Sequence, residues 1–191
     1  MLLFDLDRSI VEDKWSGIDS HVHIFTLAHA LETGWSDARL HKPIFRDFTA
    51  RDVGLPRGID KAIFVQVQND CPEEAKRVLK DNPDWLAGVV VGLQLHRNTP
   101  TQLRQQIQEL RQYSKEHCGK DLVKGARHIL AAESPDWLLQ PDVVENMGVL
   151  AEEGLVFELL ITPVHCDIIV EFVRRCPNNR VVIVTTLRNR T

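Results

Sequence analysis

Residues 62–65 read Ala-Ile-Phe-Val, and residues 88–91 read Gly-Val-Val-Val. Unbroken apolar runs of this kind are typical of parallel strands, because such strands are buried on both faces. Each run is followed by a segment in which apolar residues recur with the spacing of an amphipathic helix. This alternation predicts an α/β fold in which right-handed crossovers connect parallel strands.

The same strand–helix unit recurs along the chain, and several helix ends are marked. Thr99-Pro100-Thr101-Gln102 has the pattern of a capping box with proline at the first helical position, and Gly119 can end that helix. Further helices are expected after Cys71-Pro72, from about Pro141 to Gly154, and from Thr162-Pro163 to Pro177. Six segments are predicted strands: Gly17–Phe25, Lys61–Gln68, Ala87–Leu95, Leu122–Leu130, Gly154–Ile161 and Arg180–Thr186. The helix residues predicted to face inward are Ala75, Val78, Leu79, Leu103, Ile107, Leu110, Val143, Met147, Leu150, Ile168, Phe172 and Val173.

Composition and charge limit the classes of protein to which the chain can belong. Its 191 residues suffice for one domain with a sizeable core, and its formal net charge of −4 gives no reason to expect nucleic acid. No apolar run approaches the ~20 residues that span a bilayer, and the N-terminus lacks the basic start of a secretory signal. The four cysteines form no C-x-x-C pair, so we expect reduced thiols. The prediction is a cytoplasmic protein that binds neither nucleic acid nor membrane.

Three parts are expected along the chain: an N-terminal extension over residues 1–16, one domain over residues 17–186, and a divergent tail over residues 187–191. Within the domain, Thr26–Asp60 is too irregular for one simple helix. Long connections in compact domains are usually functional. This connection therefore predicts a loop that covers a site, with Trp35 in it.

The strongest chemical signal is the run Asp-Ser-His-Val-His at residues 19–23. Because side chains alternate along a strand, Asp19, His21 and His23 are expected to share one face. Two imidazoles in this arrangement can hold one divalent ion, or they can be core histidines hydrogen-bonded to backbone. The apolar residues on the opposite face are expected to pack under helices: Ile18, Val22 and Ile24.

Several ordered motifs together resemble a known family. They are IDSHVHIF at 18–25, KAIFVQVQ at 61–68, VKGARHIL at 123–130, the run from 134 to 161, and VEFVRRCPNNRVVIV at 170–184. They resemble the amidohydrolase-related branch of the amidohydrolase superfamily, in particular its sugar-lactone and pyrone-dicarboxylate lactonases. The resemblance implies a (β/α) TIM barrel that hydrolyses lactones or related esters and amides. Here that barrel is incomplete, with about six of its eight strands present.

The resemblance also implies roles for particular residues. His21 and His23 are expected to bind a divalent metal, most simply zinc, although other members of this branch work without one. Arg127 is expected to border the substrate pocket, since an arginine fork suits a substrate carboxylate. Gln66 and Gln94 stand near the ends of the second and third strands, where polar side chains converge on one rim.

Three further polar residues have other expected roles. Alternation puts His128 on the face opposite to Arg127, so we expect it to be either a packed group or one that supports a pocket residue. Glu158 interrupts an apolar strand and is interpreted either as a pocket acid or as the partner in a structural ion pair. His165 is expected to be a surface residue.

The end of the chain departs from the resemblance. Relatives end the sixth strand with an aspartate and a ligand histidine, where this chain has Val184 and Thr185. The aspartate that relatives bring from their last strand, as ligand or general base, has no counterpart. This predicts a truncated chain with two open sheet edges, which favour aggregation or pairing with another chain.

Three functions follow from these observations. The first is a lactonase-like hydrolase, of which this chain retains little or no activity. The second is a catalytically inactive isoform that binds a ligand or pairs through its open edges. The third is a decarboxylase of the same superfamily, which release of carbon dioxide would distinguish from a lactonase.

Overall fold

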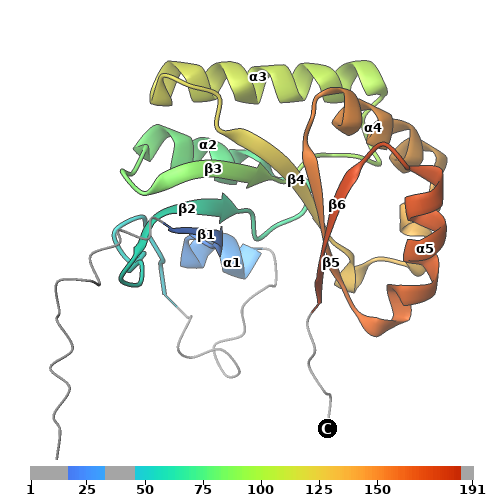
Figure 1. Cartoon of the computed structure of the whole chain (residues 1–191), viewed down its shortest axis with the longest axis horizontal. Helices are drawn as coiled ribbons and strands as arrows, with labels where there is room; N and C mark the ends of the chain where they lie inside the picture. The colour runs from blue at the N-terminus through green and yellow to red at the C-terminus, as the bar shows by residue number, and fades with distance from the viewer. Residues whose placement is uncertain (1–16, 33–45, 186–191) are drawn as a thin grey trace, which may run out of the picture.

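The computed structural model describes residues 17–32 and 46–185 of the chain (Figure 1). The predicted extension over residues 1–16, Trp35 and the predicted tail over residues 187–191 lie outside these residues. The strands are β1 (Gly17–Val22), β2 (Ile59–Val65), β3 (Leu86–Val91), β4 (Val123–Ile129), β5 (Val156–Ile161) and β6 (Arg180–Thr185). The helices are α1 (Leu27–Glu32), α2 (Pro72–Asp81), α3 (Pro100–Cys118), α4 (Pro141–Glu152) and α5 (Cys166–Arg175), with 3-10 turns η3 (Leu130–Ala132), η4 (Pro135–Leu139) and η5 (Pro163–His165).

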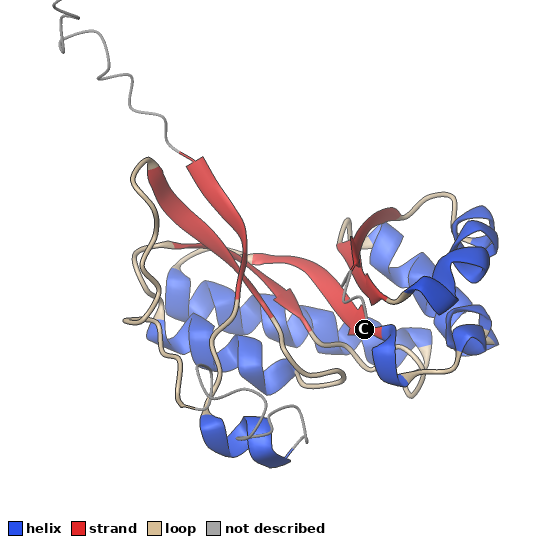
Figure 2. Ribbon diagram, turned by 90° about the horizontal axis from the view of Figure 1, so that it is seen from below, coloured by secondary structure: helices blue, strands red, loops and turns tan. Residues whose placement is uncertain are grey.

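The strands form one parallel sheet whose spatial order, β1-β2-β3-β4-β5-β6, is also the order along the chain. The sheet curls into part of a barrel, with helices α2 to α5 along its outer side (Figures 1 and 2). Strands β1 and β6 each pair with a single neighbour among the described residues, so both edges are open. The predicted incomplete TIM-barrel type of α/β fold is confirmed.

The core lies between the outer face of the sheet and the helices. Phe64, Val89, Val91 and Leu159 from the strands are at most 1% exposed. The residues predicted to point inward from α2, α3 and α4 are all buried against them. The predicted capping box is confirmed as well, because the Thr99 side chain accepts from the Gln102 backbone while the Gln102 side chain accepts from the Thr99 backbone.

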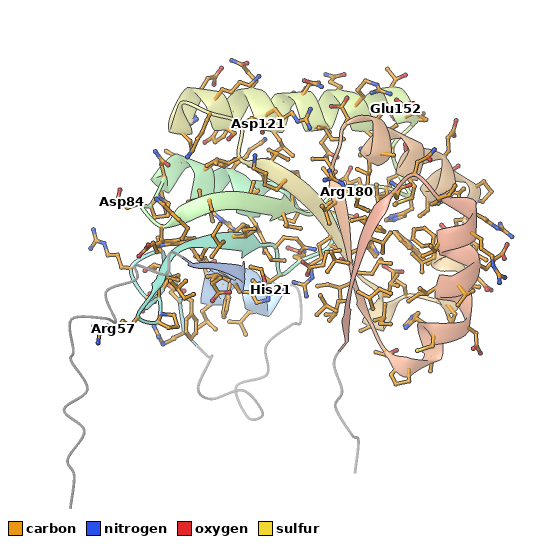
Figure 3. All side chains as sticks on the ribbon, viewed as in Figure 1. His21, Arg57, Asp84, Asp121, Glu152 and Arg180 are labelled. Carbon is orange, nitrogen blue, oxygen red and sulfur yellow. The ribbon has the colours of Figure 1, made fainter. Side chains whose placement is uncertain are left out.

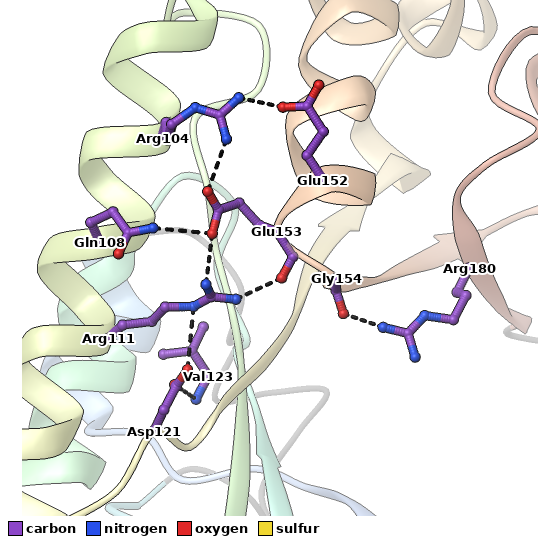
Figure 4. Close-up of polar contacts among 9 residues, drawn as sticks. All are labelled: Arg104, Gln108, Arg111, Asp121, Val123, Glu152, Glu153, Gly154 and Arg180. Carbon is purple, nitrogen blue, oxygen red and sulfur yellow. Dashed lines mark hydrogen bonds and ion pairs between the residues drawn. The ribbon is translucent and has the colours of Figure 1, made fainter.

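A polar network fixes α3 to the turn between α4 and β5 (Figure 4). Glu153 accepts from Arg104 at 2.9 Å and from Arg111 at 2.6 Å, and Arg104 also pairs with Glu152. The Glu153 side chain is 9% exposed, so the pairing arginines satisfy a nearly buried carboxylate. At the start of β6, Arg180 donates to the carbonyl of Gly154. This network lies on the outside of the sheet, away from the residues with predicted chemistry.

Two predictions about α5 are wrong. The segment begins with the 3-10 turn η5, and its buried residues recur as His165, Ile169, Phe172 and Cys176. At about 100° per residue these four form one stripe, and Val173 lies on its flank, where it is 43% exposed. His165 is only 1% exposed, because it starts this stripe and its Nδ1 lies 2.9 Å from the Thr162 hydroxyl. It is therefore a buried capping residue and not a surface histidine.

The alternation predicted for β1 is interrupted. The register with β2 shifts between Asp19 and Val22, so Ser20 and His21 both line the concave side of the sheet. Ile18 is 57% exposed and does not pack under a helix, which corrects the expectation for this residue. The reason is its place on an edge strand, where the described chain offers no second neighbour to cover it.

Candidate metal and substrate site

The two histidines of β1 lie with their ring nitrogens facing each other. Nε2 of His21 and Nε2 of His23 are 3.1 Å apart, and the rings meet edge to face with their centroids 4.7 Å apart. Nδ1 of His23 lies 2.7 Å from the carbonyl oxygen of Val65, at the end of β2. Because a carbonyl only accepts, Nδ1 of His23 carries the proton and donates it. The lone pair of His23 Nε2 is therefore directed towards His21.

The other nitrogen of His21 faces an acid from the far part of the sheet. Nδ1 of His21 is 3.5 Å from Oε1 of Glu158 on β5, and the same oxygen is 3.2 Å from Nε of Arg127 on β4. Arg127 Nη1 donates to the Gln66 carbonyl at 2.8 Å, and the Gln66 amide donates to the Arg127 carbonyl at 3.2 Å. In Figure 3, His21 lies near the middle of the molecule, on the side of the sheet away from α3. These contacts join β1, β2, β4 and β5 across the concave side.

Burial controls the charge of these groups. Burial lowers the pKa of His23 to about 4, although its hydrogen bond to Val65 opposes the shift. Burial and the nearby Arg127 lower the pKa of His21. Burial raises the pKa of Glu158, while Arg127 acts in the opposite direction. Both imidazoles are consequently neutral at pH 7, which is the state that binds metals.

A cavity of about 280 Å³ opens beside the histidines. Asp19, His21 and His23 line it from β1 and the residue that follows it, together with Val22, which was expected on the opposite face. Phe48, Thr49 and residues 52–55 form another wall, and they are part of the long connection that was expected to cover a site. That wall is held by Asp52, which accepts from Arg46 and from both the backbone and the hydroxyl of Thr49.

A second hollow of about 250 Å³ lies on the concave face of the sheet. His21 and Glu158 line it, together with apolar residues of β2, β3, β5 and β6. His21 therefore borders both spaces, and Glu158 borders only the second. A ligand in either space would meet His21.

The histidine pair fits a divalent ion as two of its ligands. Two imidazole nitrogens at 2.0–2.1 Å from one tetrahedral ion are about 3.3 Å apart, close to the 3.1 Å found here. The opposite nitrogen of each ring faces a backbone carbonyl or a carboxylate, which is the usual arrangement around histidine ligands. Within residues 17–32 and 46–185 no group of three or more His, Cys, Asp or Glu side chains is arranged to hold a metal. The described chain thus offers two ligands of a site that needs more.

The remaining candidates fall into two places. Arg127 and Gln66 belong to the contacts around Glu158, where they are 4% and 0% exposed. Gln94 lies elsewhere, with its amide 3.5 Å from the carbonyl of Asp70. His128 points to the outer side, where it is fully buried and stacked on Trp137 with ring centroids 3.8 Å apart.

His128 belongs to a second polar cluster, which the sequence did not indicate. Its Nε2 lies 3.1 Å from Oε1 of Glu133 and 3.2 Å from the amide nitrogen of Asn69. His96 packs edge to face on Trp137 and lies 3.7 Å from Asp70. Burial lowers the pKa of His128 to about 4, against the effect of Glu133. We refer to the group His96, His128, Trp137, Asn69, Asp70 and Glu133 as the rim cluster.

Sequence reasoning also missed two parts of the site itself. The Val65 carbonyl could not have been found, because any residue supplies a carbonyl and only the register of β1 with β2 brings this one near His23. The contact of Glu158 with His21 had one signal, an acidic residue within an apolar strand. That signal left the choice between a pocket acid and a structural ion pair open.

Comparisons with known proteins bear on the family and the fold of the chain. A protein-family model described as Amidohydrolase matches residues 18–184. Among solved structures, a Burkholderia multivorans amidohydrolase with bound zinc has a TM-score of 0.72 at 20% identity; the match covers 88% of this chain and 57% of that one. A putative 2-pyrone-4,6-dicarboxylic acid hydrolase from Pseudomonas putida has a TM-score of 0.62 at 20% identity, covering 88% and 56%. Amidohydrolase 2 from Bifidobacterium longum subsp. infantis has a TM-score of 0.60 at 17% identity, covering 88% and 61%.

The chain therefore spans less than two thirds of the length of these solved structures. A search of curated protein sequences found no significant match. Among the described helices, none is both long enough and apolar enough to cross a membrane.

Proposed function

Because the chain belongs to the amidohydrolase family, we propose that it carries part of a hydrolase site in which His21 and His23 bind one divalent ion, with zinc as the first candidate. The observation that supports this most strongly is the 3.1 Å separation of the two Nε2 atoms. A bound divalent ion would polarise a substrate carbonyl and lower the pKa of a water molecule. The residues of this chain would hold the imidazoles neutral and aligned for that ion.

We propose a lactone, or a related carboxylated ester or amide, as substrate. One of the similar solved structures supports this choice through its name, which refers to a 2-pyrone-4,6-dicarboxylic acid hydrolase. A dicarboxylate needs cationic donors, and among the described residues Arg127 is a cation that is joined to His21 through Glu158.

The three proposed substrate contacts differ in how they could act. Arg127 could contact a ligand in the hollow that Glu158 lines. Its guanidinium would then have to pair with the ligand and with Glu158 at the same time. Gln66 is completely buried, so its contribution would be indirect, through its two-way hydrogen bonding with Arg127. Gln94 is half-buried beside Asp70 and would act only on a part of the substrate that extends to that rim.

We expect slow turnover by this chain alone. Catalytic zinc sites generally have three protein ligands and one open position, whereas the described residues supply two. A site with only these two ligands would bind the metal less tightly and align the attacking water less well.

The test is zinc binding and hydrolysis with matched variants. Chelator-treated protein is titrated with zinc by calorimetry and then assayed on 2-pyrone-4,6-dicarboxylate and on a sugar lactone. We expect one zinc per chain in the wild type, at least hundredfold weaker binding in His23→Ala, and unchanged binding in His96→Gln, whose histidine belongs to the rim cluster. Equal zinc binding by wild type and His23→Ala would contradict the proposed site.

A second candidate function is supported by the open edges of the sheet. Ile18 on β1 is 57% exposed, and Val182 and Ile183 on β6 are 46% and 47% exposed. Apolar side chains next to unpaired strand edges favour pairing with another chain. We propose self-association through these edges as the alternative role, and sedimentation of Val182→Lys against wild type tests it: the variant should be less associated.

A further inference from the structure

The hydrogen-bond pattern fixes where the protons of both histidines lie. His23 donates from Nδ1 to Val65, so its Nε2 is an acceptor. The contact of 3.1 Å between the two Nε2 atoms then requires that His21 donates from its own Nε2. The Nδ1 of His21 is left with a lone pair, and it faces Oε1 of Glu158 at 3.5 Å.

Holding an ion between the two Nε2 atoms demands a different proton position in His21. The nitrogen that binds an ion carries no proton, so a neutral His21 must then carry its proton on Nδ1. No proton is gained or lost by the ring, because one leaves Nε2 as another binds at Nδ1. In this second tautomer the Nδ1–H group is directed at Glu158.

The carboxylate of Glu158 can accept a hydrogen bond from that N–H group. Its residue is only 7% exposed, and its Oε1 is buried without a hydrogen-bond partner among the described residues. Arg127, on the neighbouring strand, pairs with the same carboxylate at 3.2 Å and is itself held by Gln66. A carboxylate oxygen can accept more than one hydrogen bond, so this oxygen can take an N–H group from His21 in addition to its ion pair with Arg127.

We propose that Glu158 is a positioning residue that selects the Nδ1–H tautomer of His21, and that Arg127 holds Glu158 in place for this purpose. The proposal rests on the proposed metal-binding function of His21 and His23. It assigns Glu158 and Arg127 a role in preparing the ligand, distinct from any contact of Arg127 with a substrate. It also predicts that His21 and His23 respond differently to metal, because His23 already has the Nδ1–H tautomer.

The decisive experiment uses the wild-type chain labelled with ¹⁵N in histidine. Two-bond ¹H–¹⁵N correlations distinguish the two tautomers of each ring, first without metal and then with one equivalent of zinc. We expect His23 to be protonated on Nδ1 in both samples. We expect His21 to change from Nε2–H without metal to Nδ1–H with zinc.

The outcomes separate this inference from the function on which it rests. Zinc binding with His21 still protonated on Nε2 would overturn the inference and leave metal binding intact. A metal-free protein in which His21 already carries its proton on Nδ1 would overturn the predicted change of tautomer on metal binding. No change at either histidine and no zinc binding would overturn the metal site, and this inference with it.

A matched pair of variants tests the residue directly. Glu158→Gln keeps the size of the side chain and removes its charge, while Glu133→Gln makes the same change beside His128. Loss of a carboxylate that supports a ligand histidine typically weakens metal binding by 10–100-fold. We expect a loss in that range for Glu158→Gln and less than a twofold change for Glu133→Gln, with both variants folded by circular dichroism. Unchanged zinc affinity in a folded Glu158→Gln would overturn the inference, and if that variant fails to fold, the wild-type tautomers decide.

Discussion

The chain contains two pairs of histidines near the carboxyl ends of its strands, and their ring nitrogens face different surroundings. In the first pair, His21 and His23, the Nε2 atoms are 3.1 Å apart and border a cavity. In the second pair, His96 and His128, the ring centroids are 6.3 Å apart and both rings pack on Trp137. The first pair can share one ligand, and the second cannot.

The difference shows what makes a histidine available for chemistry. Both His23 and His128 are buried enough to have a pKa of about 4, so neutrality alone does not distinguish them. What distinguishes them is the direction of the unprotonated nitrogen. In the rim cluster the ring of His128 stacks on Trp137 and its Nε2 contacts Glu133. The Nε2 atoms of His21 and His23 instead face each other, so that both can contact one ion between them.

The largest effect is expected from removing the aromatic ring that holds the rim cluster together. Trp137 is 3% exposed and contacts both His96 and His128, so Trp137→Ala should cost about 3–5 kcal/mol in the free energy of unfolding. Urea unfolding followed by circular dichroism measures this loss. Zinc affinity should change less than twofold where the variant is folded, and a large change would mean that the two pairs are coupled.

The fold was predictable from the sequence because its signals are local. The apolar run at Val89 and Val91 indicated a buried strand, and the Thr99 capping box marked the start of α3 within one residue. The spacing of the two histidines likewise indicated a shared site. These patterns involve residues that are close together in the sequence, so they can be recognised without the structure.

The contact of Glu158 with His21 and the rim cluster were not predictable, because they depend on residues that are distant in sequence. Glu158 meets His21 only because the sheet curls enough to bring β5 over to β1. The shift of register near Ser20 depends on how β1 pairs with β2, and no local pattern encodes it. His165 was misjudged because its burial depends on the stripe that the whole of α5 presents to the sheet.

The next effect is a dependence of stability on pH that both pairs should share. A histidine with a pKa of about 4 in the folded chain and about 6.5 in the unfolded chain binds fewer protons when folded between these values. Its contribution is therefore complete above pH 6.5 and falls as the pH decreases to 4. For His128 the loss should be about 3 kcal/mol, from roughly 2.5 pKa units at 1.36 kcal/mol each.

The variant His128→Gln separates the two contributions. Unfolding in urea at a series of pH values should show a smaller decline between pH 6.5 and 4 than in the wild type, while His23 and His21 still contribute their share. The comparison uses the slope with pH, so any constant loss of stability in the variant cancels. An identical slope in both proteins would mean that His128 is protonated without cost in the folded state.

A smaller effect distinguishes the pairs by their response to metal. A ligand that binds only the folded state at a free concentration of 100 times its dissociation constant stabilises that state by about 2.7 kcal/mol. Zinc at such a concentration should therefore raise the unfolding temperature of wild type and of His96→Gln. It should leave His21→Ala unchanged, because one imidazole alone no longer shares the ion with a second. Equal stabilisation of all three proteins would place zinc elsewhere in the chain.

The smallest effect tests whether the carboxylate of the rim cluster resembles that of the site. Glu133 lies 3.1 Å from His128, and its side chain is 29% exposed, so water can replace much of the hydrogen bonding that Glu133 provides to His128. Glu133→Gln keeps an oxygen that accepts from His128 and should cost about 1 kcal/mol or less at pH 7, as expected for one hydrogen bond. Urea unfolding at pH 7 measures this cost. A loss several times larger would show that water does not replace the contacts of Glu133. The exposure of the two carboxylates, Glu133 and Glu158, would then not explain the difference between the two histidine pairs.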